Sequence, residues 1–371
     1  MTSVPESGGV VARPATLPER TWPNAALALL AAALVIAILD AVVVPVLVQE
    51  QATDWRAYEE ASLLLARGES PYRWTVDPNV RAVTDYPYIY PPPLAAIWGV
   101  GLTPALFAAL KVAALGAMAL FVRVSRPSSP STAAIAGAAL VGVTLVSPAV
   151  LHDLVLGNVM TLYVAAVALA LALPRQPLAG APLGILVAVA LKPAIAPFLV
   201  WMLLCRRDQF VAAFIAGLAT TAVFAVLLGP AVYVDYLVAL PKLGNLAEPF
   251  SGNLGLASIS LALAVVAIPL SIGWVAVAAR LLRPWASAAV AVGMTFLAQP
   301  TLGLNYAGLL APGLVALWFV DRRATLALVL ALPIAAVISP PLAGVVLAVV
   351  ATAVGRRDTA TSAPDAAAAR A

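Results

Sequence analysis

Ionisable side chains are rare in the apolar parts of this sequence, so the few that occur there are the first candidates for chemistry. Asp40, Lys111 and Lys192 fall inside apolar runs, and Asp54 follows the first such run by six residues. Charged groups at membrane depth are costly to bury, and they mark substrate paths, buried pairs or catalytic sites. A structural role is about as well supported for each: a packing hydrogen bond, a helix-terminus charge, or a lysine that reaches the interface.

The composition decides the class of protein that must position these groups. Of the 371 residues, 63% are hydrophobic and only 10% are charged, and the mean hydropathy is +1.00. Soluble domains carry about 25% charged residues, so this chain is neither a soluble enzyme nor a coiled coil nor a disordered polymer. The net charge of +4 comes from basic residues at the ends of apolar runs, which is typical of membrane topology and not of nucleic-acid binding. The sequence therefore predicts a polytopic membrane protein without a nucleic-acid partner.

The cysteine and histidine content limits the metal and redox chemistry. Cys205 is the one cysteine and His152 the one histidine, which excludes an intrachain disulfide, a cysteine cluster and a two-histidine metal site. We therefore expect no cofactor. A divalent cation could take part, but the spacing of the acidic residues does not demand one.

The chain divides into one membrane domain, 24–355, between two tails, 1–23 and 356–371, which are expected to be disordered and cytosolic. An all-α bundle of about 10–12 spans is expected. The first span is 24–48, and the further candidates are 92–103, 104–124, 132–150, 153–174, 179–203, 210–230, 257–282, 285–300, 305–320, 324–338 and 341–354.

Two polar segments interrupt the apolar pattern, 49–90 and 231–256. The first contains 11 of the 38 charged residues, four basic and seven acidic. Within it, 53–67 has the pattern of an amphipathic helix that Thr53 caps and Gly68 ends, and such a helix would lie along the membrane surface.

Arginine pairs predict the orientation. With a cytosolic N-terminus and twelve spans, every pair falls in the cytosol and both polar segments fall outside, as expected for a multi-pass plasma-membrane protein with cytosolic termini. The same count places His152 and Asp153 in the cytosol, as a helix-start cap and not a catalytic pair. A single crossing over 92–124 would reverse every later loop. The pairs are Arg206/Arg207, Arg280/Arg283, Arg322/Arg323 and Arg356/Arg357.

The first polar segment contains Asp54-Trp-Arg-Ala-Tyr58, Leu65-Ala-Arg-Gly-Glu-Ser-Pro-Tyr72 and Tyr86-Pro-Tyr-Ile-Tyr-Pro-Pro-Pro93. Together these pieces resemble the first outer loop of glycosyltransferase family 87, the DUF2029 group of polyprenol-phosphate-dependent mannosyltransferase-like proteins, which have a GT-C fold.

Looser matches extend the resemblance over about residues 25–310. Leu191-Lys-Pro193 is similar to a Lys-Pro helix of the family, and Asn253-Leu-Gly-Leu-Ala-Ser258 resembles an Asn-Gln-Ser segment with Leu for Gln. Asn158 stands where the family usually has Gln, and the late segment Gln299–Tyr306 lacks the family's histidine.

The resemblance implies a GT-C-like enzyme that transfers a hexose, with mannose expected, from a polyprenyl-phosphate sugar to a lipid or glycan acceptor at the outer membrane face, with inversion. Asp54 would be the general base, with Tyr58 one helical turn away on the same face. The phosphate would bind a cation, with Lys192 ranked first among Arg56, Arg73, Arg81, Lys192 and Lys242. The implied substrate-binding residues are Tyr58, Arg56, Tyr72, Tyr88, Lys192, Lys242 and Asn253.

Two other functions stay open at this point. A secondary transporter or flippase would use Asp40, Lys111 and Lys192 as coupling charges, although the chain has no clear internal repeat. A membrane scaffold that has lost catalytic activity is the third alternative.

Overall fold

The computed structural model describes most of the second half of the chain and parts of the first half. These residues are helical or irregular and contain no strand, which confirms the predicted all-α class. The first predicted span, Asp40 and Asn253 lie outside the described residues. The described residues are 53–72, 88–101, 106–107, 109–111, 153, 157–246, 255–256, 260–299, 304–321, 323–325, 327–328, 331–332, 335 and 339–368, with only the backbone given for 53, 242–246, 261, 304–305 and 358–368.

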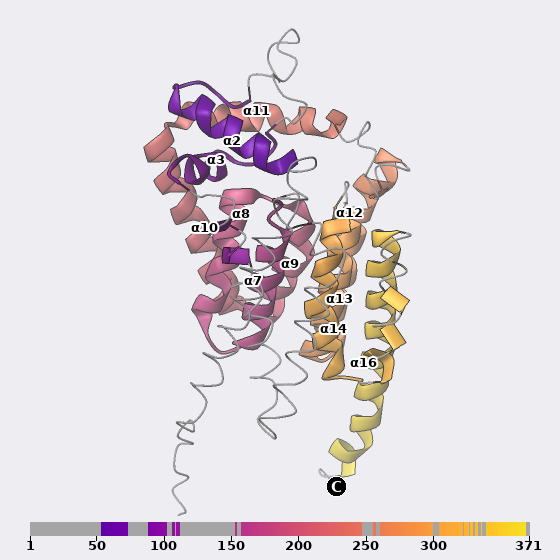
Figure 1. Cartoon of the computed structure of the whole chain (residues 1–371). Coiled ribbons are helices and arrows are strands. Elements are labelled where there is room, and N and C mark those ends of the chain that lie inside the picture. The colour runs from indigo at the N-terminus through magenta and orange to yellow at the C-terminus, as the bar shows by residue number, and fades with distance from the viewer. Residues whose placement is uncertain are drawn as a thin grey trace, which may run out of the picture.

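Among the residues that the structure describes, three helices are long and apolar enough to cross a membrane: 207–228, 262–281 and 340–357. Several shorter apolar helices pack beside them (Figure 1). The elements are α2 (Thr53–Ala66), α3 (Pro92–Gly99), α7 (Met160–Ala172), η3 (Pro177–Gly180), α8 (Ala181–Ala190), η4 (Pro193–Ile195), α9 (Ala196–Cys205), α10 (Arg207–Leu228), α11 (Pro230–Leu246), α12 (Leu261–Leu281), α13 (Pro284–Ala298), η6 (Leu304–Leu309), α14 (Leu310–Trp318) and α16 (Pro340–Ala368).

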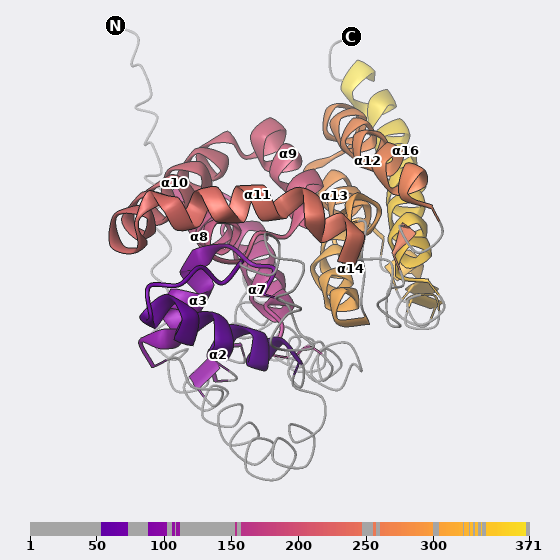
Figure 2. The same cartoon turned by 90° about the horizontal axis from the view of Figure 1, so that it is seen from above.

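Two helices lie across one end of this bundle, α2 and α11 (Figures 1 and 2). The helix predicted for 53–67 is confirmed to within one residue. It ends because Gly68 takes a φ of +71°, and the Glu69 amide then donates to the Leu64 carbonyl at 2.9 Å. This i to i−5 bond is the Schellman arrangement that closes many helices.

Helix α7 is the centre of the half of the bundle that carries the site. Nearly all of its residues are buried, and most are alanine, valine or leucine. A helix that is apolar on every side needs neighbours all round, and α8, η3, η6 and α14 all pack against it.

Helices α8 and α9 form a hairpin, whereas the sequence predicted one span over 179–203. A Cβ on Gly180 or Gly184 would meet the α10 backbone at Gln209 or Ala213 respectively, so α8 and α10 start at the same end and run parallel. Since α10 follows directly on α9, α9 must return toward the start of α8. The single-span prediction is wrong here.

The reason for this turn is local. Lys192 precedes Pro193 and has an extended backbone, with φ −123° and ψ 106°. A residue before proline is disfavoured in the helical region by the proline ring. Each helix of the hairpin has ten residues, or about 15 Å of length at 1.5 Å per residue, about half of a hydrocarbon core.

The other half of the bundle consists of α12, α13, α14 and α16. Helices α13 and α16 cross closely where Gly293 faces Gly344, and a Cβ on either would overlap the carbonyl oxygen of the other. Small residues at such crossings let helix backbones approach, as in many membrane helix pairs.

The arginine pairs gather at the end of the bundle opposite α2 and α11. Short contacts join the helix ends there: Cys205 lies 3.9 Å from the Ala279 carbonyl, and the rings of Trp285 and Phe319 are 5.1 Å apart. Gly355 packs on α13 at the same level. Of the predicted arginine pairs, the described members are Arg206, Arg207, Arg280, Arg283, Arg323, Arg356 and Arg357, and Arg322 lies outside the described residues.

Asp153 lies at the α2 end, which corrects its predicted position on the arginine side. The Asn158 amide nitrogen donates to the Asp153 carbonyl at 3.1 Å, and the Asn158 side chain reaches Asp54 on α2. The predicted span 92–103 contains only the eight residues of α3, about 12 Å. Placing Asp153 at the α2 end reverses the end of the bundle predicted for the residues that follow it. The α8–α9 hairpin reverses it a second time, so the described arginines of the predicted pairs still lie at one end.

Candidate functional site

Asp54 in the first turn of α2 is the acidic centre of the site. Its side chain is partly buried, and its Oδ2 accepts a hydrogen bond of 2.7 Å from Nδ2 of Asn158. Asn158 is nearly fully buried and comes from the loop before α7. Two segments more than 100 residues apart in sequence thus meet at one carboxylate.

The side-chain amide of Asn158 also bonds to Tyr90, and Tyr90 in turn bonds to Lys192. Nδ2 of Asn158 also donates to the Tyr90 hydroxyl at 3.1 Å, and Nζ of Lys192 donates to that hydroxyl at 2.9 Å. Carboxylate, amide, phenol and ammonium therefore form one continuous hydrogen-bonded chain. We call Asp54, Asn158, Tyr90 and Lys192 the polar chain.

Aromatic rings surround the Lys192 ammonium. It lies 4.5 Å from the centre of the Tyr90 ring and 5.5 Å from that of Tyr306. Such faces attract a cation but do not neutralise it. Among the described residues, no carboxylate lies within 4 Å of this ammonium, whereas Lys111 has one at 3.1 Å.

The side chains of Tyr72 and Tyr88 hold the backbone around Tyr90 in place. The Tyr88 hydroxyl donates to the Pro91 carbonyl at 2.6 Å and accepts from the Ala95 amide at 3.0 Å. The Tyr72 hydroxyl donates to the Tyr90 carbonyl at 2.6 Å. The hydroxyls of Tyr72 and Tyr88, both predicted to bind substrate, therefore bond to the backbone of this segment.

Tyr58 lies one turn after Asp54 on the buried face of α2, as the spacing predicted. Its ring packs against Tyr90 and Trp98, with centres 5.4 and 5.2 Å away. Its hydroxyl is buried and meets no described polar atom in good hydrogen-bonding geometry, but it lies near enough to the Tyr90 hydroxyl for that group to lower its pKa. The Tyr58 hydroxyl therefore lies beside the polar chain.

Burial dominates the electrostatics of Asp54. Loss of water around the carboxylate raises its pKa above the usual value, while Lys192 and the hydrogen bond from Asn158 oppose that rise. Burial also raises the pKa of Tyr58 and Tyr90. Both phenols therefore stay neutral at physiological pH and can act only as hydrogen-bonding groups.

A second buried group of charges lies directly beside the polar chain. Nζ of Lys111 is 3.1 Å from Oδ2 of Asp153 and donates to its carbonyl at 2.9 Å. The Asp153 carboxylate also accepts from the amides of Met160 and Thr161 at 3.1 and 3.3 Å. Asp153 therefore caps the start of α7, the kind of role predicted for it, but at the α2 end of the bundle.

The remaining predicted site residues do not join this cluster in the described part of the chain. Arg56 lies on the exposed face of α2. Only the backbone of Lys242 is described, within α11. Arg73, Arg81 and Asn253 lie outside the described residues.

Asn158 and Asp153 were not predicted to bind substrate, and Tyr90 was predicted only as one of several aromatic side chains of the first polar segment that could stack on a sugar. Tyr90 belongs to the Tyr-Pro-rich piece of the outer segment, and Asn158 stands at a position that the resemblance had marked. Asp153 was predicted to cap the start of a helix, but the span count placed it at the wrong end of the bundle and so away from the site.

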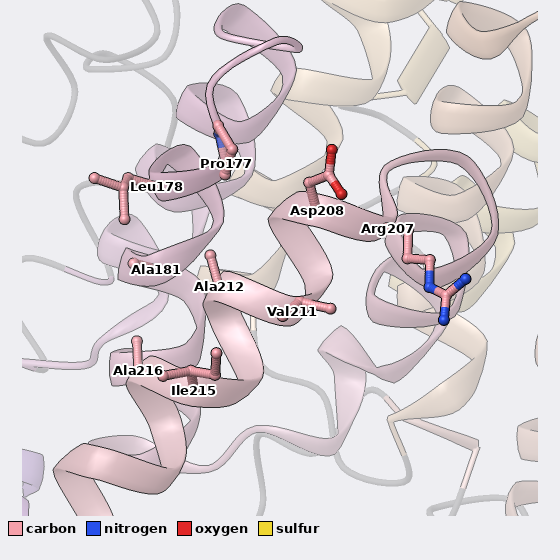
Figure 3. Close-up of a pocket in the computed structure, with 9 residues that line it drawn as sticks. All are labelled: Pro177, Leu178, Ala181, Arg207, Asp208, Val211, Ala212, Ile215 and Ala216. Carbon is pink, nitrogen blue, oxygen red and sulfur yellow. The ribbon is translucent and has the colours of Figure 1, made fainter.

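No metal site is evident in the described ranges, which contain no group of three or more His, Cys, Asp or Glu side chains that could hold an ion. A groove of about 520 Å³ lies at the opposite end, between η3, α8 and the first turns of α10 (Figure 3). Apart from Arg207 and Asp208 its lining is apolar. It is remote from the polar chain and offers no reactive group to it.

Comparisons of the chain with protein-family models, with curated proteins and with solved structures find no match.

Proposed function

We propose that this protein is an inverting membrane glycosyltransferase. It moves a hexose, expected to be mannose, from a polyprenyl-phosphate sugar to a hydroxyl of a lipid or glycan acceptor at the outer membrane face. The observation that carries the proposal is the polar chain, in which a partly buried carboxylate and a buried ammonium are joined by two hydrogen-bonding side chains.

The two ends of the polar chain match the two charges that develop in such a transfer. The acceptor oxygen forms a bond to the anomeric carbon while its proton moves to Asp54, and the bond from that carbon to the phosphate oxygen breaks. The departing polyprenyl phosphate keeps the electron pair of that bond. A positioned base and a positioned cation accelerate such a step by acting where charge develops.

Lys192 supports the phosphate assignment by what surrounds it. Its ammonium has a phenol hydroxyl and two aromatic faces as partners, and no carboxylate of the described residues is in direct contact with it, although Asp54 is near enough to interact with its charge. A phosphate oxygen would supply a direct anionic contact through a charge-assisted hydrogen bond.

The placement at the outer face is supported by the arginines. They gather at the end opposite α2, where Cys205 approaches Ala279 and Trp285 packs on Phe319. Basic residues are enriched on the cytosolic side of membrane proteins. The polar chain would then open to the outer side, where polyprenyl-linked sugar donors are used.

A donor screen tests the proposal. Purified protein in lipid is incubated with radiolabelled polyprenyl-phosphate sugars and a membrane extract as acceptor source. We expect one hexose donor to give labelled product, and Asp54→Asn to abolish it. Glu59→Gln, which removes an exposed carboxylate from the same helix, is the matched control and should keep full activity. Transfer by Asp54→Asn at the normal rate would refute the assignment of the base.

One observation supports the transporter or flippase alternative. Two buried lysines, Lys111 and Lys192, lie close enough to Asp54 to lower the pKa of its carboxyl group. This alternative predicts substrate counterflow in proteoliposomes that depends on Lys192 and on Asp40. Lys111 is engaged by Asp153 at 3.1 Å, which favours a static role for that lysine. Counterflow without any sugar transfer would favour the transporter.

A further inference from the structure

The loop residues Gly157 and Asn158, just before α7, are held by contacts on both sides. The backbone amide of Asn158 donates to the Asp153 carbonyl at 3.1 Å. Gly157 has a φ of +76°, and a Cβ there would overlap the Trp55 indole. Only glycine tolerates both conditions without strain, so the loop can adopt this shape and lie against α2.

Asp153 ties the same loop to α7 with three hydrogen bonds. Its carboxylate accepts from the amides of Met160 and Thr161, and from the Thr161 hydroxyl at 2.6 Å. Lys111 holds Asp153 from the other side through both its carboxylate and its carbonyl. Asp153 is therefore bonded at every polar atom of its side chain.

We propose that Asp153 and Lys111 are positioning residues of the Asp54 site. They fix the backbone of Asn158 so that its amide faces Asp54 and Tyr90, and in this way they set the orientation and proton affinity of the Asp54 carboxylate. Neither residue touches a substrate. The catalytic consequence rests on the proposed function, but the effect on the ionisation of Asp54 does not.

The direction of the effect follows from the groups around the carboxylate. The Asn158 amide donates to it and stabilises the ionised form, so loss of that bond raises the pKa of Asp54. Removal of Lys111 alone would raise the pKa of Asp54 through the loss of a positive charge, and removal of Asp153 alone would lower it through the loss of a negative charge. Neither single variant therefore separates the effect of positioning from the effect of charge. The titratable and polar groups that face Asp54 are Lys192, Asn158, Asp153, Lys111, Tyr58 and Tyr90.

Two charge-neutral changes isolate the positioning effect. The double variant Lys111→Met with Asp153→Leu removes both charges of the pair and every bond that Asp153 makes through its side chain. Thr161→Val removes only the hydroxyl that donates to Asp153, and it keeps all charges. Thr161→Val serves as the test should the double variant fail to fold.

The chain offers a matched control at the other end of α7. Gln209 is also a buried amide, and its Nε2 donates to the carbonyls of Ala170 and Leu173 at 3.1 and 2.7 Å. Gln209→Leu therefore removes a buried amide of α10 that bonds to the last turn of α7, with a comparable loss of hydrogen bonds but at the end of α7 opposite Asp54.

The experiment is a pH titration of Asp54 by difference infrared spectroscopy on the purified full chain. The band of the protonated carboxyl group is assigned by its loss in Asp54→Asn. We expect Asn158→Leu to raise the midpoint by about one to two pH units, the equivalent of one hydrogen bond to a charged group. The double variant and Thr161→Val should shift it in the same direction, with Thr161→Val giving the smaller shift, and Gln209→Leu should leave it unchanged.

Two results would overturn the inference. An unchanged midpoint in Asn158→Leu would show that the amide does not set the proton affinity. A shift in Asn158→Leu with none in the double variant or in Thr161→Val would show that Asp153 and Lys111 do not position it. If the expected shifts occur but the wild type transfers no sugar from any donor, the proposed function fails and the inference stands.

Discussion

The two buried lysines near Asp54 have opposite environments. Lys111 is fully buried and contacts a carboxylate at 3.1 Å and a carbonyl at 2.9 Å. Lys192 is 7% exposed and contacts a phenol hydroxyl at 2.9 Å and the faces of two tyrosine rings. One ammonium is in direct contact with a carboxylate of the protein, and the other has no carboxylate of the described residues within 4 Å.

This difference indicates different roles. Burying an ammonium is unfavourable unless an anion and hydrogen bonds compensate it. Lys111 meets that condition within the protein, as expected of a residue that holds structure. Lys192 meets it only in part, as expected of a residue whose anion arrives with a ligand.

The largest effect is expected for Lys192→Met. Because this variant removes the cation proposed to receive the phosphate, kcat/KM for sugar transfer should fall by about 100-fold or more. Binding of a polyprenyl phosphate should weaken as well, while the melting temperature of the ligand-free protein should not fall. Lys192→Arg keeps the charge and should retain part of the activity. Wild-type donor affinity in Lys192→Met would remove the contrast between the two lysines.

Lys111→Met should instead act on stability. It leaves the Asp153 carboxylate buried without its cation, and breaking a buried pair in this way costs about 3–5 kcal/mol of the free energy of unfolding. The measurement is unfolding of the purified protein by a denaturing detergent. Replacing Asp153 with leucine in the same chain should recover part of the loss. A Lys111→Met protein as stable as the wild type would contradict a structural role.

Tyr90→Phe tests the link between the two ends of the polar chain. The variant keeps the ring beneath Lys192 but removes the hydroxyl that accepts from Lys192 and Asn158. The loss of one such acceptor corresponds to about 1–3 kcal/mol, so transfer should fall by about tenfold or more. Tyr88→Phe is the control, because the Tyr88 hydroxyl bonds to the Pro91 carbonyl and the Ala95 amide and not to the polar chain. An equal loss of sugar transfer in both variants would show that the Tyr90 hydroxyl has only a structural role.

The smallest effect concerns Asp54 and stability. Burial raises the pKa of Asp54, so its ionised form weakens folding, and this penalty appears as the pH rises through the raised pKa. Asp54→Asn should therefore melt slightly higher than the wild type at neutral pH. The difference should disappear below about pH 4, where the carboxyl group is protonated in both the folded and unfolded states. A difference that does not change with pH would contradict this explanation.

The sequence predicted those parts of the site that depend on local patterns. Helix α2 could be predicted because Gly68 and the amphipathic spacing are encoded within fifteen residues. Asp54 and Tyr58 follow from the position of that helix, and Lys192 from its isolation in an apolar run. Each of these predictions needed only neighbouring residues.

The rest depends on contacts between distant segments. Within the apolar run 179–203, only Pro193 after Lys192 indicates a hairpin instead of a single span. The run is long enough to span a membrane once, so this proline does not by itself predict a turn. The side on which Asp153 lies depends on how 92–124 crosses. Asn158 meets Asp54 and Tyr90 only because three segments converge, which periodicity and composition cannot show.

The most direct test of the central claim is to measure donor binding and sugar transfer on the same Asp54→Asn protein. If Asp54 takes the proton of the acceptor while Lys192 holds the phosphate, the variant binds the polyprenyl-phosphate sugar with nearly wild-type affinity and transfers no detectable sugar. Transfer at the wild-type rate with equal binding would contradict the account.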